Sequence, residues 1–273
     1  MNNLICPVCK LKLSGEKTFK CENNHCFDIS KYGVVNLALS NKSSKKRHGD
    51  DKMMVLARKD FLDSGYYEPI QKSVTKLIDK YCSDAKAIVD AGCGEGYYTK
   101  AAADCTNASE IYGIDISKEA LRYFKKRLNN ALPIVSSIFK MPIKDESTDI
   151  VMNMFAPLPN EEFLRILKDD GYLIRTFVLK DHLIELKQAI YDNAYCNKPE
   201  NEQVDGFRLI DKIIVDKMIT VHGENIKNLF CMTPYYYKTG IKDQQKLEKL
   251  NEITTKIQVE TAIYQKCDFN KEL

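Results

Sequence analysis

Four cysteines and a histidine near the beginning of the chain have the spacing of a metal site. Two residues separate Cys6 from Cys9, eleven separate Cys9 from Cys21, and three more precede the adjacent pair His25 and Cys26. A Cys-x2-Cys turn aims two thiolates at one point, and a second hairpin can supply the other two ligands of a tetrahedral zinc ion. The first three cysteines are therefore expected ligands. The fourth is either His25 or Cys26, because adjacent residues rarely both reach one ion, and the spacing fits each of them.

The zinc expected here is structural. A module of under about forty residues buries too little apolar surface to fold by itself, and a bound metal is the usual remedy. The chain has ten cysteines, and in a reducing compartment clustered cysteines indicate metal binding rather than disulfides. A catalytic zinc would need an open coordination position and a nearby acid or base, which nothing in this pattern requires.

A second group of residues has the pattern of a nucleotide-binding turn. An apolar strand pattern ends at Asp90, and Gly92, Gly94 and Gly96 follow before a helical pattern begins. Glycine allows a tight turn and lets a ligand approach the backbone. A dinucleotide site needs its third glycine at position 97, which is Tyr97 here. The pattern Asp-x-Gly-x-Gly-x-Gly instead resembles motif I of class I S-adenosylmethionine methyltransferases, whose ligand has no phosphate and carries a cationic amino group that suits Asp90.

Later residues extend this expected site. Asp115 ends the next strand pattern, twenty-three residues after Gly92. A carboxylate at the tip of the second strand can accept hydrogen bonds from both hydroxyls of a ribose. Ser136 and Ser137 end the third strand pattern, where the adenine usually lies. Ligands bind at the carboxyl ends of the strands in such sheets, so we expect these loops to meet.

The motifs lie within an alternation of strand and helix patterns. Strand patterns cover 87–91, 111–115, 134–136, 149–154 and 172–177, followed by a strand pair near 212–221 and 259–268. Helical patterns cover 53–80, 97–105, 118–128, 161–167 and 182–195. This alternation predicts an α/β fold, a class I (Rossmann-like) methyltransferase domain with a mostly parallel sheet and helices on both faces, plus a small N-terminal zinc-binding β domain.

Three parts are expected along the chain. Residues 1–37 form the zinc-binding domain, 38–85 a basic connector and helical segment, and 86–273 the methyltransferase domain. The boundaries follow changes in composition, because the stretch from 40 to 52 is polar and basic.

The composition excludes some functions. The net charge is +3, so the chain is not a strongly basic nucleic-acid binder, and RNA contacts must come from local patches such as Lys42, Lys45, Lys46 and Arg47. No apolar run approaches the roughly 20 residues that span a bilayer. Residues 1–6 lack the basic and apolar segments of a signal peptide. We therefore expect a cytoplasmic protein without a membrane partner.

Taken in order, the motifs resemble the bacterial 23S rRNA guanine-N1 methyltransferases of the RlmA type over nearly the whole chain. Motif I is shared by many methyltransferases, whereas the other segments are more specific because they occur together and in order. The segments are the Cys-Pro-x-Cys opening with Cys21-x3-His25, the stretch Met53-Met54…Ala57-Arg58…Phe61-Leu62-Asp63…Gly65-x-Tyr67-x-Pro69, the run Gly92-Cys93-Gly94-Glu95-Gly96, the segment His182-Leu183-x-Glu185-Leu186-Lys187, and Met232-Thr233-Pro234.

The resemblance implies several roles. It implies a zinc site of three cysteines and one histidine, which selects His25 as the fourth ligand. It also implies that Tyr67 and His182 flank the cofactor S-adenosylmethionine, besides Gly94 and Glu95. The implied reaction moves a methyl group to N1 of a guanine in a hairpin loop of 23S rRNA, with the zinc module assisting RNA recognition. A homodimer is compatible with the resemblance.

One departure from the family pattern falls where the target base would enter. The family commonly has an Arg-x-Tyr-Ala-Pro stretch after the fourth strand, whereas this chain has 153–157 as Asn-Met-Phe-Ala-Pro. Phe155 and Tyr98 are candidate stacking partners for a guanine flipped out of its stack.

Guanine N1 carries a proton and becomes a good nucleophile only after losing it. Asp63, His182 and Glu185 are candidates for the assisting base. The sequence selects none of them, and the catalytic residue stays unassigned.

Three other functions compete with this interpretation. A small-molecule methyltransferase would share the cofactor site and differ in its target. A zinc-containing RNA-binding protein with an inactive transferase domain is disfavoured by the intact glycines and Asp115. A nicotinamide enzyme is disfavoured by Tyr97.

Overall fold

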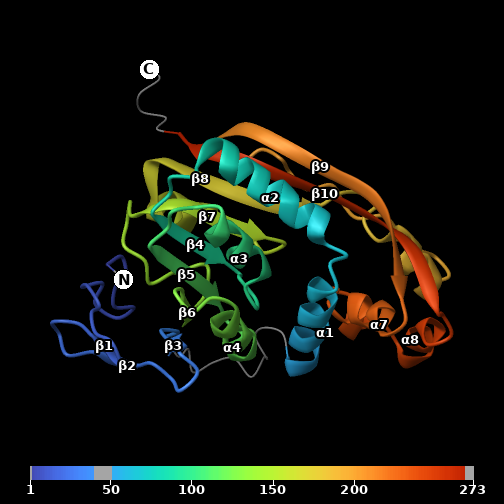
Figure 1. Cartoon of the computed structure of the whole chain (residues 1–273), viewed down its shortest axis with the longest axis horizontal. Coiled ribbons are helices and arrows are strands. Elements are labelled where there is room, and N and C mark those ends of the chain that lie inside the picture. The colour runs from blue at the N-terminus through green and yellow to red at the C-terminus, as the bar shows by residue number, and fades with distance from the viewer. Residues whose placement is uncertain (1, 40–50, 268–273) are drawn as a thin grey trace.

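A computed structural model describes residues 2–39 and 51–267 of the chain (Figure 1). The N-terminal segment contains a short antiparallel hairpin of β1 (Thr18–Lys20) and β2 (Cys26–Asp28). The next strand, β3 (Val35–Asn36), leaves this hairpin and pairs with a strand of the main sheet. The zinc module therefore contributes a strand to the larger domain.

The main sheet has eight strands in the order β3-β6-β5-β4-β7-β8-β10-β9. Pairing from β3 through β8 is parallel, and β10 and β9 add an antiparallel hairpin at the end of the sheet. This confirms the mostly parallel sheet. The remaining bounds are β4 (Ala87–Ala91), β5 (Glu110–Asp115), β6 (Leu132–Val135), β7 (Thr148–Met154), β8 (Leu167–Val178), β9 (Phe207–His222) and β10 (Glu252–Lys266).

Every predicted helical pattern contains a helix in the structure. One pattern is split into two helices, and another forms a shorter helix than predicted. The pattern over 53–80 breaks in two at Gly65, whose φ of 83° is unfavourable for other residues. The helix predicted over 182–195 is shorter in the structure, because the backbone of Leu183 is in the left-handed conformation and that of Tyr191 is extended. The helices are α1 (Lys52–Asp63), α2 (Glu68–Tyr81), α3 (Tyr97–Asp104), α4 (Lys118–Arg127), α5 (Asn160–Ile166), α6 (Ile184–Ile190), α7 (Glu224–Cys231) and α8 (Ile241–Leu247), with a 3-10 turn at Tyr236–Lys238.

The two faces of the sheet are covered differently. Apolar residues of α2 and α3 pack on one face beside β4 and β7, and α4 packs on the same face beside β5 and β6. On the other face, α5 shares a core with the zinc module, where Leu4, Leu13 and Phe19 pack in one cluster with Val89 and Val151 of the sheet. The expectation of helices on both faces therefore holds in part, because the zinc module covers much of the second face.

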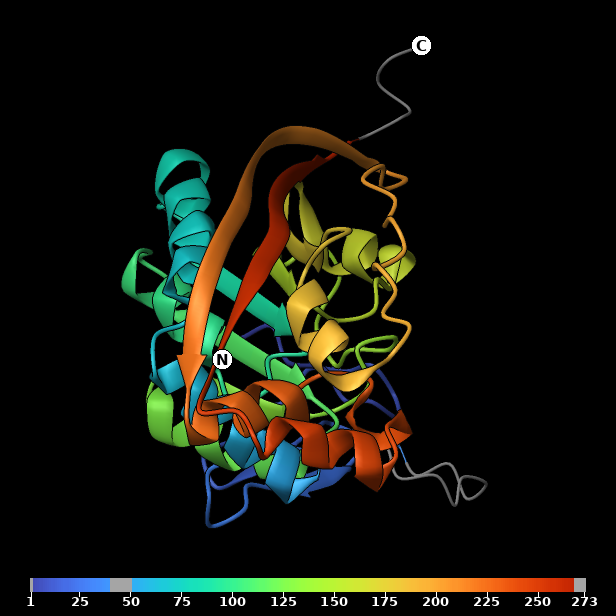
Figure 2. The same ribbon diagram turned by 90° about the vertical axis from the view of Figure 1, so that its right-hand side faces the viewer.

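The β9–β10 hairpin is longer than the strand beside it. Along β10, pairing with β8 begins at Val259, opposite Val178, and residues 252–258 pair with β9 alone. The hairpin thus projects past the carboxyl ends of the parallel strands. It carries α7 and α8, and α7 packs against α1 (Figures 1 and 2). Neither α7 nor α8 was predicted from the sequence.

Within the residues that the structure describes, no helix has the length and apolar character needed to cross a bilayer.

Candidate functional site

The cysteine cluster closes around one point. The Sγ atoms of Cys9 and Cys21 lie 3.6 Å apart, and Nδ1 of His25 lies 3.6 Å from Cys6 Sγ and 3.3 Å from Cys21 Sγ. All four candidate ligand atoms fall within 4.8 Å of one another. Ligands at zinc bond lengths of about 2.0–2.3 Å in a tetrahedron are roughly 3.5–3.8 Å apart. The donor set and its spacing therefore fit a structural zinc ion.

Cys26 lies outside this cluster. Its side chain is exposed and its thiol points to the carbonyl oxygen of Asn24. The backbone N–H of Leu11, together with the neighbouring ligand side chains, lowers the pKa of Cys9 to about 6 despite the opposing effect of burial. Because the thiolate is the metal-binding form, this environment favours a zinc ligand. Of the two residues left open by spacing, the structure brings His25 into the cluster.

The glycine-rich turn connects β4 to α3. Gly92, Gly94 and Gly96 all have positive φ, at 87°, 55° and 85°. A Cβ at Gly96 would lie 2.7 Å from the ring of Phe124, so this position also needs glycine for packing. At Gly94 the nearest atom to such a Cβ is Nη1 of Arg58, 4.0 Å away. Gly96 thus supports the fold, whereas Gly94 faces open space.

Asp115 is at the turn, as its place at the end of β5 predicts. Its Oδ2 accepts from the backbone N–H of Gly94 at 2.9 Å, and its Oδ1 accepts from the N–H of Ser117 at 2.8 Å. Ser136 lies beside it, since its N–H donates to the Asp115 carbonyl oxygen at 3.1 Å. The carboxyl ends of β4, β5 and β6 therefore meet, and the acid and the glycines share one site.

Asp90 is buried below the turn, with 1% of its surface exposed. The Thr99 hydroxyl donates to its Oδ2 at 2.5 Å, whereas no described residue hydrogen-bonds to its Oδ1. Burial raises the pKa of Asp90 to about 7, against the Thr99 hydrogen bond and with help from Asp115 and Glu95. A buried carboxylate oxygen without a partner indicates room for a hydrogen-bond donor or cation from a ligand.

Glu95 is a second buried acid in the turn. Its Oε1 lies 3.6 Å from Nη2 of Arg127, beyond hydrogen-bonding distance. Burial raises the pKa of Glu95, and its own backbone N–H, Arg127 and Arg58 partly oppose the rise. Arg127 is closer to Asp63, at 2.8 Å. Glu95 therefore keeps an oxygen that a bound ligand could use.

Tyr67 and His182 meet at the carboxyl edge of the sheet from separate segments. The N–H of Gln258 donates to Nδ1 of His182 at 3.1 Å, so the neutral ring carries its hydrogen on Nε2, which lies 3.3 Å from the Tyr67 hydroxyl oxygen. Burial, and then the charge of Lys187, lower the pKa of His182 to about 3. The imidazole is therefore neutral at physiological pH and fixes the Tyr67 ring.

The three candidate bases are engaged elsewhere. Ion pairs with Arg127 and Lys59 lower the pKa of Asp63, although burial opposes them. Both nitrogens of His182 have partners. Glu185 Oε2 accepts from the N–H of Lys256 at 2.8 Å and the Thr255 hydroxyl at 3.1 Å. Each of the three side chains is therefore held by contacts within the protein.

The predicted stacking pair lies beside the turn. Phe155 follows β7 with a φ of 56°, is 42% exposed, and its ring centroid is 6.2 Å from that of Tyr98. Asn153, which stands where the family commonly has arginine, donates through Nδ2 to the Pro157 carbonyl oxygen at 2.9 Å. This hydrogen bond closes the loop that presents Phe155, so the departure from the family pattern has a structural role here.

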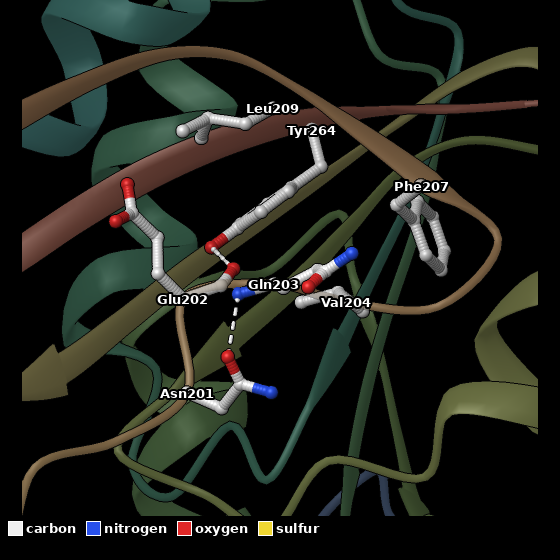
Figure 3. A pocket seen from close by; sticks show the side chains of 7 residues that line it. All are labelled: Asn201, Glu202, Gln203, Val204, Phe207, Leu209 and Tyr264. Carbon is white, nitrogen blue, oxygen red and sulfur yellow. Dashed lines mark hydrogen bonds between the residues drawn. The ribbon is translucent and has the colours of Figure 1, made fainter.

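A pocket of about 410 Å³ lies elsewhere. It opens near the beginning of β9 and the end of β10, and none of its seven lining residues belongs to the predicted site (Figure 3). In it the Tyr264 hydroxyl donates to the carbonyl oxygen of Glu202 at 2.8 Å. The predicted cofactor residues gather instead at the carboxyl edge, where ligands bind in sheets of this topology.

Comparisons with known proteins agree with this arrangement. Residues 83–254 match the family described as "Methyltransferase domain", and residues 4–45 match the one described as "RlmA, N-terminal", a zinc ribbon. Among solved structures, the YcgJ protein of Bacillus subtilis superposes with a TM-score of 0.52 at 14% identity, covering 72% of this chain and 99% of that one. The protein is therefore a class I S-adenosylmethionine-dependent methyltransferase with an N-terminal zinc ribbon.

Sequence relatives narrow the class. The 23S rRNA (guanine(748)-N(1))-methyltransferase of Streptomyces fradiae is 31% identical over 68% of this chain and 67% of its own length. YxjB of Bacillus subtilis (strain 168), which carries the name of a 23S rRNA (guanine-N(1)-)-methyltransferase, is 31% identical over 69% of each chain. The chain belongs to the 23S rRNA (guanine-N1)-methyltransferase family. The predicted family, enzyme class and two cofactors are confirmed.

The sequence assigns no role to Arg58 beyond its place in one of the segments that carry the family resemblance. Its position near Gly94 depends on how α1 packs, which no local pattern specifies.

Proposed function

We propose that the protein transfers a methyl group from S-adenosylmethionine to N1 of a guanine in a hairpin loop of 23S rRNA. The observation that carries the proposal is that a methyltransferase site and the zinc ribbon of this family occur in one chain whose relatives are named for that reaction. The exposed aromatic Phe155 at the edge of the site supports a base as the acceptor.

The proposed donor site uses the residues expected from the sequence. The backbone of the glycine turn accommodates the donor, Asp115 accepts from the ribose hydroxyls, and Asp90 lies near the cationic amino group. The proposed set is Tyr67, Asp90, Gly92, Gly94, Glu95, Gly96, Asp115 and His182, and the proposed zinc ligands are Cys6, Cys9, Cys21 and His25. The unpartnered oxygens of Asp90 and Glu95 support this assignment.

The protein's contribution to the reaction is mainly positioning. S-adenosylmethionine supplies an electrophilic methyl group on a good leaving group. Phe155 and Tyr98 would hold the guanine ring by stacking, which is sequence-tolerant and suits a flipped base. Correct orientation of donor and acceptor can contribute about 7–11 kcal/mol of the barrier. The engaged Asp63, His182 and Glu185 support this emphasis over proton abstraction by any of the three.

The remaining assignments follow from this function. We propose that the 23S rRNA hairpin is the partner, that the zinc module and the basic run 42–47 assist in holding it, and that the protein works in the cytoplasm. The basic run lies outside the described residues. A homodimer and the division into 1–37, 38–85 and 86–273 are part of the same proposal, and light scattering and limited proteolysis test them.

Mass mapping of 23S rRNA tests the proposed target. A strain lacking the gene should lose one N1-methylguanine from a hairpin loop, and the gene supplied on a plasmid should restore it. Unchanged rRNA modification would contradict the ribosomal target. Calorimetry then separates the alternatives, since a small-molecule methyltransferase would still bind S-adenosylmethionine, an inactive RNA-binding protein would not, and a nicotinamide enzyme would bind NAD.

A further inference from the structure

Arg58 brings a positive charge to the glycine turn from a distant part of the chain. It lies in the middle of α1, and its Nη1 is 4.0 Å from the position that a Cβ on Gly94 would take. Gly94 is the glycine of the turn whose side-chain direction faces open space. The half-buried guanidinium therefore borders the volume in which the donor is proposed to lie.

Tyr98 offers an unused hydrogen-bond donor beside the same volume. It lies in the first turn of α3, directly after the glycines, and 9% of its surface is exposed. No described residue hydrogen-bonds to its hydroxyl. Arg58 and Glu95 are both near enough to influence the ionisation of that hydroxyl. A buried O–H without an acceptor is costly, so an acceptor from a ligand is expected at this point.

The chemistry of the donor identifies that acceptor. Of its charged groups, the sulfonium and the ammonium are cations and the carboxylate is the one anion. The nearby acids Asp90 and Asp115 suit the ammonium and the ribose, and neither would attract the carboxylate. A guanidinium and a phenolic hydroxyl are both donors, and together they match a carboxylate.

We propose that Arg58 and Tyr98 together bind the carboxylate of the methionine moiety of S-adenosylmethionine. This assignment rests on the proposed placement of the donor in the glycine turn. It gives α1 a direct part in donor binding, and it explains why a residue of the helical segment faces a motif of the methyltransferase domain. An RNA phosphate is the competing ligand for Arg58, but the burial of the Tyr98 hydroxyl favours a small ligand inside the site.

Calorimetric titration of the zinc-loaded full chain tests the assignment. The two ligands are S-adenosylmethionine and its decarboxylated form, which differs from it only by loss of the carboxylate. The wild-type protein should prefer S-adenosylmethionine by about tenfold or more, as expected for a charge-assisted contact. Arg58→Gln should abolish most of this preference by weakening the binding of S-adenosylmethionine alone. Tyr98→Phe should reduce the preference by a smaller factor.

Control variants separate this contact from a general effect. Arg122→Gln removes an arginine from α4 that pairs with Glu119 and stacks on Tyr32, and it should leave the preference unchanged. Arg58→Lys keeps the charge without the planar fork and should retain part of the preference. The melting temperature of each variant shows whether it folds.

Several outcomes would overturn the assignment. Arg58→Gln could weaken the binding of both ligands equally, which would indicate an indirect effect through the fold. It could leave both affinities unchanged and weaken binding of a hairpin RNA, which would make Arg58 a phosphate ligand. A wild-type protein that binds neither ligand would contradict both proposals. Intact donor binding, together with 23S rRNA modification that is unchanged in the deletion strain, would contradict the proposed target but not the carboxylate contact.

Discussion

The zinc cluster and the donor site are built in opposite ways. The four metal-binding side chains come from one stretch of twenty residues, 6–25, and a hairpin brings them together. The proposed donor site takes Tyr67 from the junction of α1 and α2, Asp115 from the end of β5, and His182 from a loop beside β10, in addition to the glycine turn. A site within one short segment is visible in the sequence, whereas a site assembled from distant segments is visible only where each segment carries its own motif.

The two regions also differ in how they depend on the rest of the molecule. The zinc module is local in sequence but not independent in structure, because its Leu4 and Phe19 pack in the core of the sheet. Its backbone is bonded to the main domain as well, with the Ile5 N–H donating to the Pro142 carbonyl oxygen and the Lys144 N–H donating to that of Asn3. Loss of the zinc ion should therefore also lower the stability of the main sheet.

Removing the metal should have the largest effect. A chelator should unfold the module, since zinc contributes about 10–16 kcal/mol in small zinc-finger peptides. Loss of the shared packing should also lower the melting temperature of the methyltransferase domain by roughly 10 °C, at about 2–4 °C per kcal/mol. Calorimetric melting with and without chelator measures both. Cys26→Ala, outside the cluster, is the matched control, and an unchanged sheet transition would show that the module is independent.

Substitution by alanine should have different effects on stability at two glycines of the same turn. Gly96→Ala combines a left-handed backbone with a contact at 2.7 Å to the Phe124 ring, and should cost about 2–4 kcal/mol of unfolding free energy. Gly94→Ala meets no atom closer than 4.0 Å. It should cost only about 1 kcal/mol from backbone strain while weakening donor binding. Urea unfolding and calorimetry separate the two, and equal losses of stability would contradict the distinction.

His182 should make stability depend on acidity. Its folded pKa of about 3 lies below the ordinary value of 6.5, so the unfolded chain takes up a proton first as the pH falls. Its contribution is constant above pH 6.5 and falls by about 1.4 kcal/mol per pH unit below it. Between pH 7.5 and 5, the free energy of unfolding measured in urea should fall by roughly 2 kcal/mol more for the wild-type protein than for His182→Gln. Parallel curves for the two proteins would exclude a buried neutral histidine.

The smallest of the expected effects is a release of protons from Asp90 when the donor binds. Its pKa of about 7 in the donor-free protein leaves it largely protonated at pH 6.5, and a bound ammonium would favour the ionised form. Binding of S-adenosylmethionine should then release roughly half a proton or more at pH 6.5, and much less at pH 8.5. Calorimetry in buffers of different ionisation enthalpy measures the release. Asp90→Asn should abolish it, and a release that persists in this variant would assign the proton to another group.

The sequence predicts the parts of this molecule that local chemistry determines. The strand over 87–91, the turn after it and the helix from Tyr97 follow from apolar runs and glycine spacing, and all three are observed. The helices α7 and α8 were missed because they depend on packing against distant elements, α7 against α1 and α8 against α6. Likewise, a residue such as Arg58 acquires its place from the packing of α1, which no period in the sequence encodes.

The short strand β3 has one more consequence. Its two residues, Val35 and Asn36, cover the backbone of β6 that would otherwise form the rim of the sheet. An exposed edge strand presents a row of unpaired amide and carbonyl groups to which the strand of another chain can pair, and proteins generally cover such edges. If the metal is lost and β3 detaches, β6 becomes an exposed edge strand. Zinc binding is therefore also expected to protect the protein from self-association.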